Sequence, residues 1–164
     1  MGGGSLQVSL FDKDALVTTQ GLKMGSLRIR QRLQELEKTT IHYDKLVEEF
    51  IRNDLMSFQR LYLKDKEIRN VILMGDFITD MIFQEEMEDR IITREEFMKR
   101  YEDTVGKSVD LLAQEMEIDP EYASLVVPTM VVCRNFIDIF NAESLWAPGV
   151  SLLDGIAYDF AEKK

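Results

Sequence analysis

Hydrophobic and polar residues alternate near the start of the chain. Ser5–Phe11 carries apolar side chains at positions 6, 8 and 10, Asp12–Asp14 is polar, and Ala15–Met24 forms a second extended stretch. A period of two is typical of a β-strand with one buried face. Two such stretches on either side of a short polar segment predict a β-hairpin.

The middle of the chain has helical periodicity. Between Tyr43 and Tyr62, apolar residues recur at steps of three and four, at Leu46, Phe50, Ile51, Leu55, Phe58 and Tyr62. This spacing lays one apolar stripe along an amphipathic helix. A further helix is predicted from Asp76 to Met87, with three apolar residues facing inward, namely Ile78, Met81 and Ile82.

Capping signals mark where later helices begin. Thr93 is followed three residues later by Glu96, which is a capping-box pattern, and one helical face then carries Phe97, Tyr101 and Val105. A short helix is predicted over Lys107–Met116. Asp119 before Pro120 predicts an N-cap with proline at the first helical position.

Pro128 lies inside the helical stretch that begins at Pro120. Because proline lacks a backbone N–H and clashes with the preceding turn, Pro128 is expected to divide this stretch into two helices. The second runs from Pro128 to Asn141, with one face made by Val132, Phe136 and Phe140. A final helix is predicted from about Leu152.

Two short apolar runs predict further strands. Asn70–Met74, ended by Gly75, is typical of a buried parallel strand, and Glu143–Trp146 is a second short strand. No linker or internal repeat separates these elements. The pattern therefore predicts one helix-rich α/β domain, with a hairpin on one side of the sheet and two short parallel strands on the other.

Composition limits the partners. The chain has 164 residues, enough for one domain with a core, and is 45% hydrophobic and 30% charged, which is ordinary for a globular protein. Its net charge of −10 disfavours nucleic acid and anionic membranes as partners. With neither a signal peptide nor a long apolar span in the sequence, we expect a cytoplasmic protein.

One segment is locally basic. No acidic residue occurs between Ala15 and Gln34, and four basic residues fall there, at Lys23, Arg28, Arg30 and Arg32. One interpretation is a solvated basic helical turn that balances nearby acids. The other is a patch that faces phosphate.

Residues for metal or nucleophilic chemistry are sparse. One cysteine, Cys133, lies in an apolar run and predicts a buried, inert thiol. Together with the one histidine, His42, it cannot form a zinc site. The acidic run Glu85–Asp89 suits either a cation or, more commonly, a solvated helix end.

Gly2, Gly3, Gly4 and Ser5 form a glycine tract at the start of the chain. Consecutive residues without Cβ atoms expose a string of backbone N–H groups, and proteins approach phosphate closely in this way. The alternative is a synthetic Gly/Ser spacer left by cloning.

These motifs, in this order, resemble the second lobe of the exopolyphosphatase / guanosine pentaphosphate phosphatase (Ppx/GppA) family, within the actin, sugar kinase and Hsp70 group. Gly2–Ser5, the hairpin and the Gly-x-x-Arg step at Gly25–Arg28 match the opening of that lobe. Pro128–Phe140 resembles its late helix, Leu145–Pro148 its last core strand, and Leu152–Ile156 the turn into its final helix. The resemblance covers roughly the whole chain.

The resemblance implies a ribonuclease H-like lobe, with residues 1–164 as a single domain and the first lobe absent. It implies a phosphoanhydride hydrolase acting on polyphosphate or guanosine pentaphosphate with magnesium. Phosphate would be bound by Gly2, Gly3, Gly4, Ser5 and Arg28. The family's catalytic glutamate belongs to the first lobe, so this chain supplies no catalytic residue and no metal ligand, and is expected to be inactive alone.

Several positions depart from the family pattern. Gln7 stands where an acidic residue is usual, and a neutral amide binds a hard cation poorly. The second glycine-rich turn keeps Gly75 but gains Asp76 and Asp80, which repel phosphate. Leu153 replaces an arginine. Each change weakens a phosphate or metal contact.

The family's central first strand precedes the glycine tract and is missing here. The hairpin and the parallel strands should therefore either leave a gap or pair directly. An unpaired central edge exposes N–H and C=O groups, so the expected partners include the missing first lobe and a second copy in a homodimer.

Three hypotheses follow. The chain is one lobe of a hydrolase that is active only with its first lobe, or part of a non-catalytic relative that binds guanosine alarmones or polyphosphate. The third is a helical interaction module that has inherited only the fold.

Overall fold

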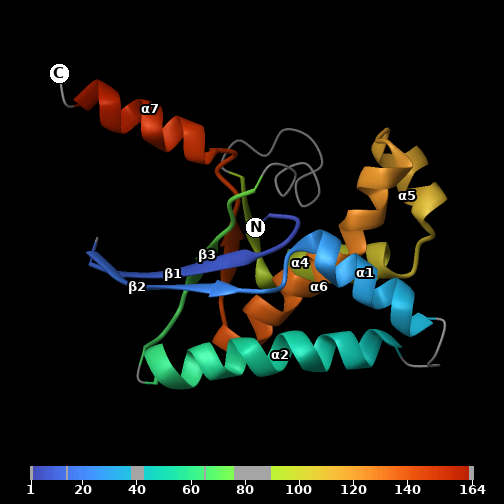
Figure 1. The fold of residues 1–164 in the computed structure, drawn as a ribbon, viewed down its shortest axis with the longest axis horizontal. Coiled ribbons are helices and arrows are strands. Elements are labelled where there is room, and N and C mark those ends of the chain that lie inside the picture. Colours follow the sequence, from blue (N-terminus) through green and yellow to red (C-terminus); the bar gives the residue numbers. More distant parts are fainter. Residues whose placement is uncertain (1, 14, 38–42, 65, 76–89, 163–164) are drawn as a thin grey trace.

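The computed structural model describes residues 2–13, 15–37, 43–64, 66–75 and 90–162 (Figure 1). Its elements in chain order are β1 (Leu6–Asp12), β2 (Ala15–Leu22), α1 (Ser26–Glu37), α2 (Tyr43–Tyr62), β3 (Asn70–Ile72), β4 (Ile91–Thr93), α4 (Arg94–Val105), α5 (Val109–Met116), α6 (Pro120–Phe140), β5 (Ser144–Trp146) and α7 (Leu152–Glu162). The predicted helix-rich α/β class is confirmed. The helix predicted from Asp76 to Met87, the acidic run at 85–89 and His42 lie outside the described residues.

The opening hairpin is confirmed. β1 pairs antiparallel with β2, with a shift of register between Leu10 and Phe11. Leu6, Val8 and Leu10 are buried, whereas the residues between them are exposed. The alternation in the sequence thus directs one face of β1 into the core.

A second sheet has the strand order β3–β5–β4. β3 and β5 are parallel, as predicted, and β4 adds an antiparallel strand that the sequence analysis did not predict. The expectation that β3 is buried was wrong, because Val71 is half-buried and Ile72 is exposed. Helices cover one face of this sheet, and the face with Ile72 remains open within the described part of the chain.

The hairpin and the three-stranded sheet are separate in the described structure. The central position between them is not filled by direct pairing of the two halves. Of the two expected arrangements, direct pairing is not seen among the described residues.

α6 is one continuous helix, which corrects the prediction that Pro128 divides it. Asp119 caps its start by accepting a hydrogen bond from the amide of Glu121 at 2.8 Å. Pro128 is buried in mid-helix. Packing of α6 against α1, α2, α4 and α5 compensates for the lost backbone hydrogen bond.

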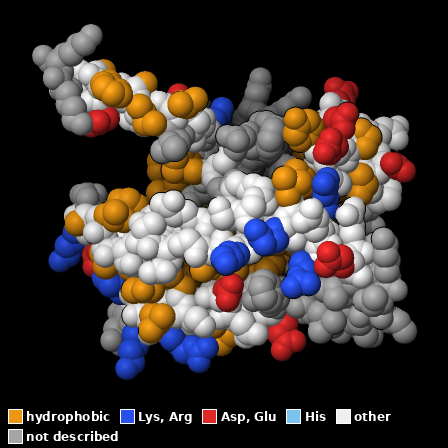
Figure 2. Space-filling model, viewed as in Figure 1, with side chains coloured by type: hydrophobic (Ala, Val, Ile, Leu, Met, Phe, Trp, Pro, Cys, Tyr) orange, Lys and Arg blue, Asp and Glu red, His pale blue; other side chains and the backbone are white. Residues whose placement is uncertain are grey.

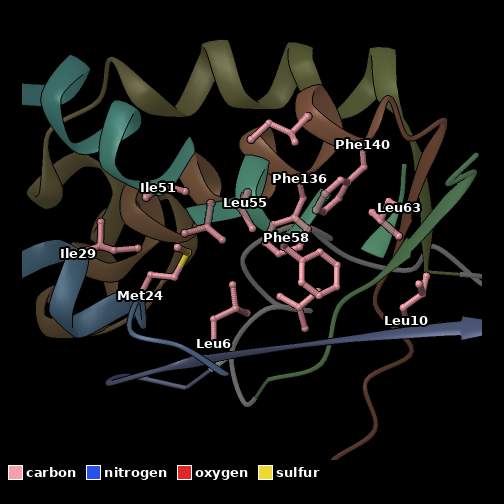
Figure 3. Packing of buried hydrophobic residues seen from close by; sticks show 13 residues of the cluster. Leu6, Leu10, Met24, Ile29, Ile51, Leu55, Phe58, Leu63, Phe136 and Phe140 are labelled. Carbon is pink, nitrogen blue, oxygen red and sulfur yellow. The ribbon is translucent and has the colours of Figure 1, made fainter. Parts of the chain in front are cut away.

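Two apolar clusters meet at α6. One joins the hairpin, α1 and α2 to α6 through Leu6, Leu10, Met24, Ile29, Ile51, Leu55, Phe58, Phe136 and Phe140 (Figure 3). The other joins α4, α5 and the second sheet to α6 through Ile92, Phe97, Tyr101, Leu112, Val126, Ile137 and Leu145. α6 is therefore the central helix of the core.

No long apolar span was expected from the sequence, and this expectation was wrong, because α6 is both long and apolar. α6 is the one described helix with the length and hydropathy to cross a membrane. However, 72% of its most apolar window is buried inside the protein. Its apolar character is explained by its place between the two clusters.

The predicted apolar stripes are mostly confirmed. Ile51, Leu55 and Phe58 of α2 are buried. The side chains of Leu46 and Phe50 are not among those that the structure describes. The capping box at Thr93 is present, with reciprocal hydrogen bonds to Glu96. Phe97 and Tyr101 are buried, but Val105, in the last turn of α4, is exposed.

Candidate functional site

The glycine tract is folded against the start of α1. The carbonyl of Gly2 accepts a hydrogen bond from the amide of Ser26, and the carbonyl of Gly3 accepts one from the amide of Arg28, each at 3.2 Å. The amide of Gly2 donates to the carbonyl of Ser5 at 3.0 Å. The tract thus satisfies amides that the first helical turn leaves unpaired. This arrangement disfavours the flexible-spacer interpretation.

Close backbone packing requires glycine at position 25, whereas the nearest neighbour of Gly3 is a side chain. A Cβ atom added to Gly25 would lie 2.3 Å from the carbonyl carbon and oxygen of Gly3. A Cβ atom added to Gly3 would lie 2.5 Å from Cδ1 of Leu27. Gly25 therefore has a structural role whether or not a ligand binds, whereas the exposed Leu27 side chain can move aside from a larger residue at position 3.

Gly4 has no such packing constraint. Nothing lies within 4 Å of a Cβ atom placed there, and its φ is not positive. Gly4 and Ser5 are exposed, and the amides of Gly3, Gly4 and Ser5 donate no hydrogen bond within the described structure. These three amides are donors of the type that binds phosphate oxygens.

Arg28 lies over this open part of the tract. Its Nε donates a hydrogen bond to the carbonyl of Gly4 at 3.1 Å, and the side chain is exposed. Its two terminal nitrogens have no partner among the described residues. A guanidinium oriented in this way can present two N–H donors to a phosphate or carboxylate.

Two other basic residues of this segment contact groups outside the tract. Arg30 donates from Nη1 to the hydroxyl of Ser124 on α6 at 2.7 Å, and Arg32 pairs with Glu35 at 3.5 Å. Arg30, two residues from Arg28, lies on a different face of α1, whereas Arg32, four residues along, shares the face of Arg28. Figure 2 shows Lys and Arg side chains near the end of β2 and the start of α1, and among the described residues Arg28 donates a hydrogen bond to the tract.

The magnesium implied by the sequence resemblance finds no site in the described part of the chain. No group of three or more His, Cys, Asp or Glu side chains gathers there. Gln7 is exposed on β1, and Leu153 lies exposed on α7. Asp76 and Asp80 lie outside the described residues.

Cys133 is buried in α6, as predicted. Burial raises the pKa of its thiol to about 12, so the thiolate needed for nucleophilic attack is scarce at neutral pH. This residue fills the second apolar cluster and is not a candidate nucleophile.

Sequence reasoning missed how the tract is held. It placed Arg28 beside the tract by resemblance alone, and it gave no role to the carbonyls of Gly2 and Gly3. The available signal was Gly25, which lies directly before the first residue of α1. A glycine directly before a helix allows another backbone segment to approach the start of that helix closely, because it has no Cβ atom.

Comparison with known proteins supports the fold. The Aquifex aeolicus member of the Ppx/GppA family superposes with a TM-score of 0.80 at 14% identity, over 99% of this chain and 54% of its own. An exopolyphosphatase from Cytophaga hutchinsonii gives 0.71 at 14% identity, over 99% and 55%. An exopolyphosphatase-like protein gives 0.78 at 14% identity, over 98% and 56%.

The chain thus has the fold of about half of a Ppx/GppA structure, as the sequence resemblance predicted. It spans 54–56% of the length of these solved structures. No family model and no curated protein matches the sequence.

Proposed function

We propose that residues 1–164 form the second lobe of a two-lobed phosphoanhydride hydrolase whose substrate is polyphosphate or guanosine pentaphosphate. The observation that carries this proposal is the hydrogen bond from Arg28 to the carbonyl of Gly4, beside three surface amides without partners. The fold shared with about half of each Ppx/GppA structure supports it.

In this proposal each group has a defined task. The amides of Gly3, Gly4 and Ser5 bind phosphate oxygens, and Gly4 keeps the approach open because it has no side chain. Gly2 holds the turn through Ser5. Arg28 neutralises charge and fixes the position of the bound phosphate. Water activation is assigned to the missing first lobe, so no catalytic residue is named here.

Magnesium is not assigned to this chain. Its usual ligands are carboxylate and phosphate oxygens, and the described residues gather no carboxylate cluster. A second candidate function is suggested by the lack of a carboxylate cluster among the described residues, by Gln7 in place of an acidic residue and by Leu153 in place of an arginine. The parent protein would then bind alarmone or polyphosphate without hydrolysing it. Cytoplasmic location, and the absence of nucleic-acid and membrane partners, stay predictions.

Substitution of Arg28 tests the binding site. Arg28→Ala is expected to weaken tripolyphosphate binding at least ~10-fold, about 1.4 kcal/mol, because a charge-assisted contact is lost. Arg32→Ala is the matched control, since it removes the same charge four residues along α1 from a side chain that pairs with Glu35. Isothermal titration calorimetry measures both variants.

Equal losses for Arg28→Ala and Arg32→Ala would show that only net charge matters, and would contradict the site. No binding by the unchanged chain at millimolar tripolyphosphate would favour the third hypothesis, an interaction module without a phosphate ligand.

A further inference from the structure

The packing of α1 decides where the Arg28 guanidinium lies. α1 packs on α6 (Figure 1). Of the α1 side chains that the structure describes, Ile29 alone is fully buried, in the apolar cluster that joins the hairpin, α1 and α2 to α6 (Figure 3). The hydrophobic effect has no direction, so a helix held at its first turn and by one apolar side chain can still tilt and turn. Either movement would displace Arg28 from the tract.

Arg30 makes a directional contact between α1 and α6. Its Nη1 donates a hydrogen bond to the hydroxyl of Ser124 at 2.7 Å. The Ser124 hydroxyl donates to the carbonyl of Glu121 at 2.6 Å, so its proton is directed there and its lone pairs are available to Arg30. A charged donor makes a stronger hydrogen bond than a neutral one. The contact is partly buried, and water therefore competes with it less than at the surface.

The surroundings of this contact indicate a role in orientation. Pro128 has no N–H, so the carbonyl of Ser124 lacks the donor that an α-helix normally supplies four residues on. Nε of Arg30 is buried and has no hydrogen-bond partner among the described residues. A buried charged group with an unpaired donor costs stability relative to an apolar side chain of similar size. The contact is therefore explained by the geometry that it imposes and not by added stability.

We infer that Arg30 is a positioning residue for the phosphate site. Its hydrogen bond to Ser124 fixes α1 on α6 and thereby holds the Arg28 guanidinium over the glycine tract. Arg30 lies on a different face of α1 from Arg28, so it acts through Arg28 and does not contact the phosphate. The inference rests on the proposed function, because it concerns the same site.

Binding measurements on three variants separate orientation from charge. Ser124→Ala removes the acceptor without changing the net charge, and Arg30→Met removes the donor but keeps an apolar stem. Each is expected to raise the dissociation constant for tripolyphosphate roughly 5- to 10-fold, because Arg28 is no longer held in place. Arg30→Lys keeps a charged donor and is expected to bind within about 2-fold of the unchanged chain. Ser57→Ala is the matched control, since this hydroxyl donates within α2 to Asn53.

Stability and a double variant distinguish positioning from a purely structural role. Arg30→Met is expected to change the unfolding equilibrium constant by less than about 3-fold, because the unpaired Nε is lost together with the hydrogen bond. Urea denaturation followed by circular dichroism measures this change. In a chain that already carries Arg28→Ala, Arg30→Met is expected to alter tripolyphosphate binding by less than about 2-fold, since no guanidinium is left to position.

Hydrogen exchange measures the positioning without any ligand. The amides of Ser26 and Arg28 donate to the carbonyls of the tract. In Ser124→Ala they are expected to exchange at least ~5-fold faster than in the unchanged chain, because α1 moves more freely on α6. Ser57→Ala is expected to leave both exchange rates unchanged.

The outcomes tell the two proposals apart. If the unchanged chain binds no tripolyphosphate, the proposed function fails and this inference fails with it. If it binds, but Ser124→Ala binds as tightly and exchanges as slowly, the inference alone is overturned. Arg30→Lys binding as weakly as Arg30→Met, an unfolded Arg30→Met chain, or a loss that persists beside Arg28→Ala would each contradict positioning through Arg28.

Discussion

The isolated chain is expected to release no phosphate above background from polyphosphate or guanosine pentaphosphate, even with magnesium present. Hydrolysis needs a group that activates water and a metal or cation that stabilises the developing charge. Within the described residues no carboxylate cluster gathers, and Cys133 is buried with a raised pKa. Binding without turnover is the behaviour that the proposal of a separate first lobe predicts.

Phosphate release over hours, measured colorimetrically, checks this prediction. The Aquifex aeolicus Ppx/GppA phosphatase serves as the positive control for the assay. Turnover approaching about one per second, the low end of ordinary enzymes, would refute the proposal that catalysis requires a first lobe. It would also show that a water-activating group lies in this chain.

Gly25→Ala is expected to lower the free energy of unfolding by about 3 kcal/mol. The added Cβ would meet the carbonyl group of Gly3 at 2.3 Å, and backbone cannot move aside as a flexible side chain can. The displaced tract would also lose its hydrogen bonds to the amides of Ser26 and Arg28. Urea denaturation followed by circular dichroism measures the change.

Gly4→Ala is the matched control, because the space around its Cβ position is open. Its stability is expected to change by less than about 0.5 kcal/mol, while tripolyphosphate binding weakens because a methyl group stands beside the donor amides. If Gly25→Ala is as stable as Gly4→Ala, the tract does not pack against α1 as described. If Gly4→Ala binds normally, the open amides are not the site.

Local patterns predicted most elements of the fold. The alternation in β1, the apolar stripe of α2 and the capping box at Thr93 each depend on neighbouring residues alone. Pro128 was misjudged because burial between two apolar clusters outweighs a local steric rule. β4 was missed because its three residues run directly into α4, and its last residue, Thr93, was assigned only as the cap of that helix.

The candidate site was predictable in part. Resemblance placed Arg28 beside the glycine tract, and the structure brings them together. The grouping of Arg28 with Arg30 was not resolved because the bounds of α1 were not predicted, and in this helix residues two apart lie on different faces. The capping of α1 by glycine carbonyls depends on contacts between distant segments, which no local pattern encodes.

The central claim is that the open amides of the glycine tract and the Arg28 guanidinium form half of a phosphate site. A titration of the ¹⁵N-labelled chain with tripolyphosphate, followed by NMR, tests it most directly. We predict saturable shifts at the amides of Gly3, Gly4 and Ser5 and at the Nε–H of Arg28, all with one dissociation constant. Shifts spread over exposed Lys and Arg side chains across the surface, with these four signals unmoved, would contradict the claim.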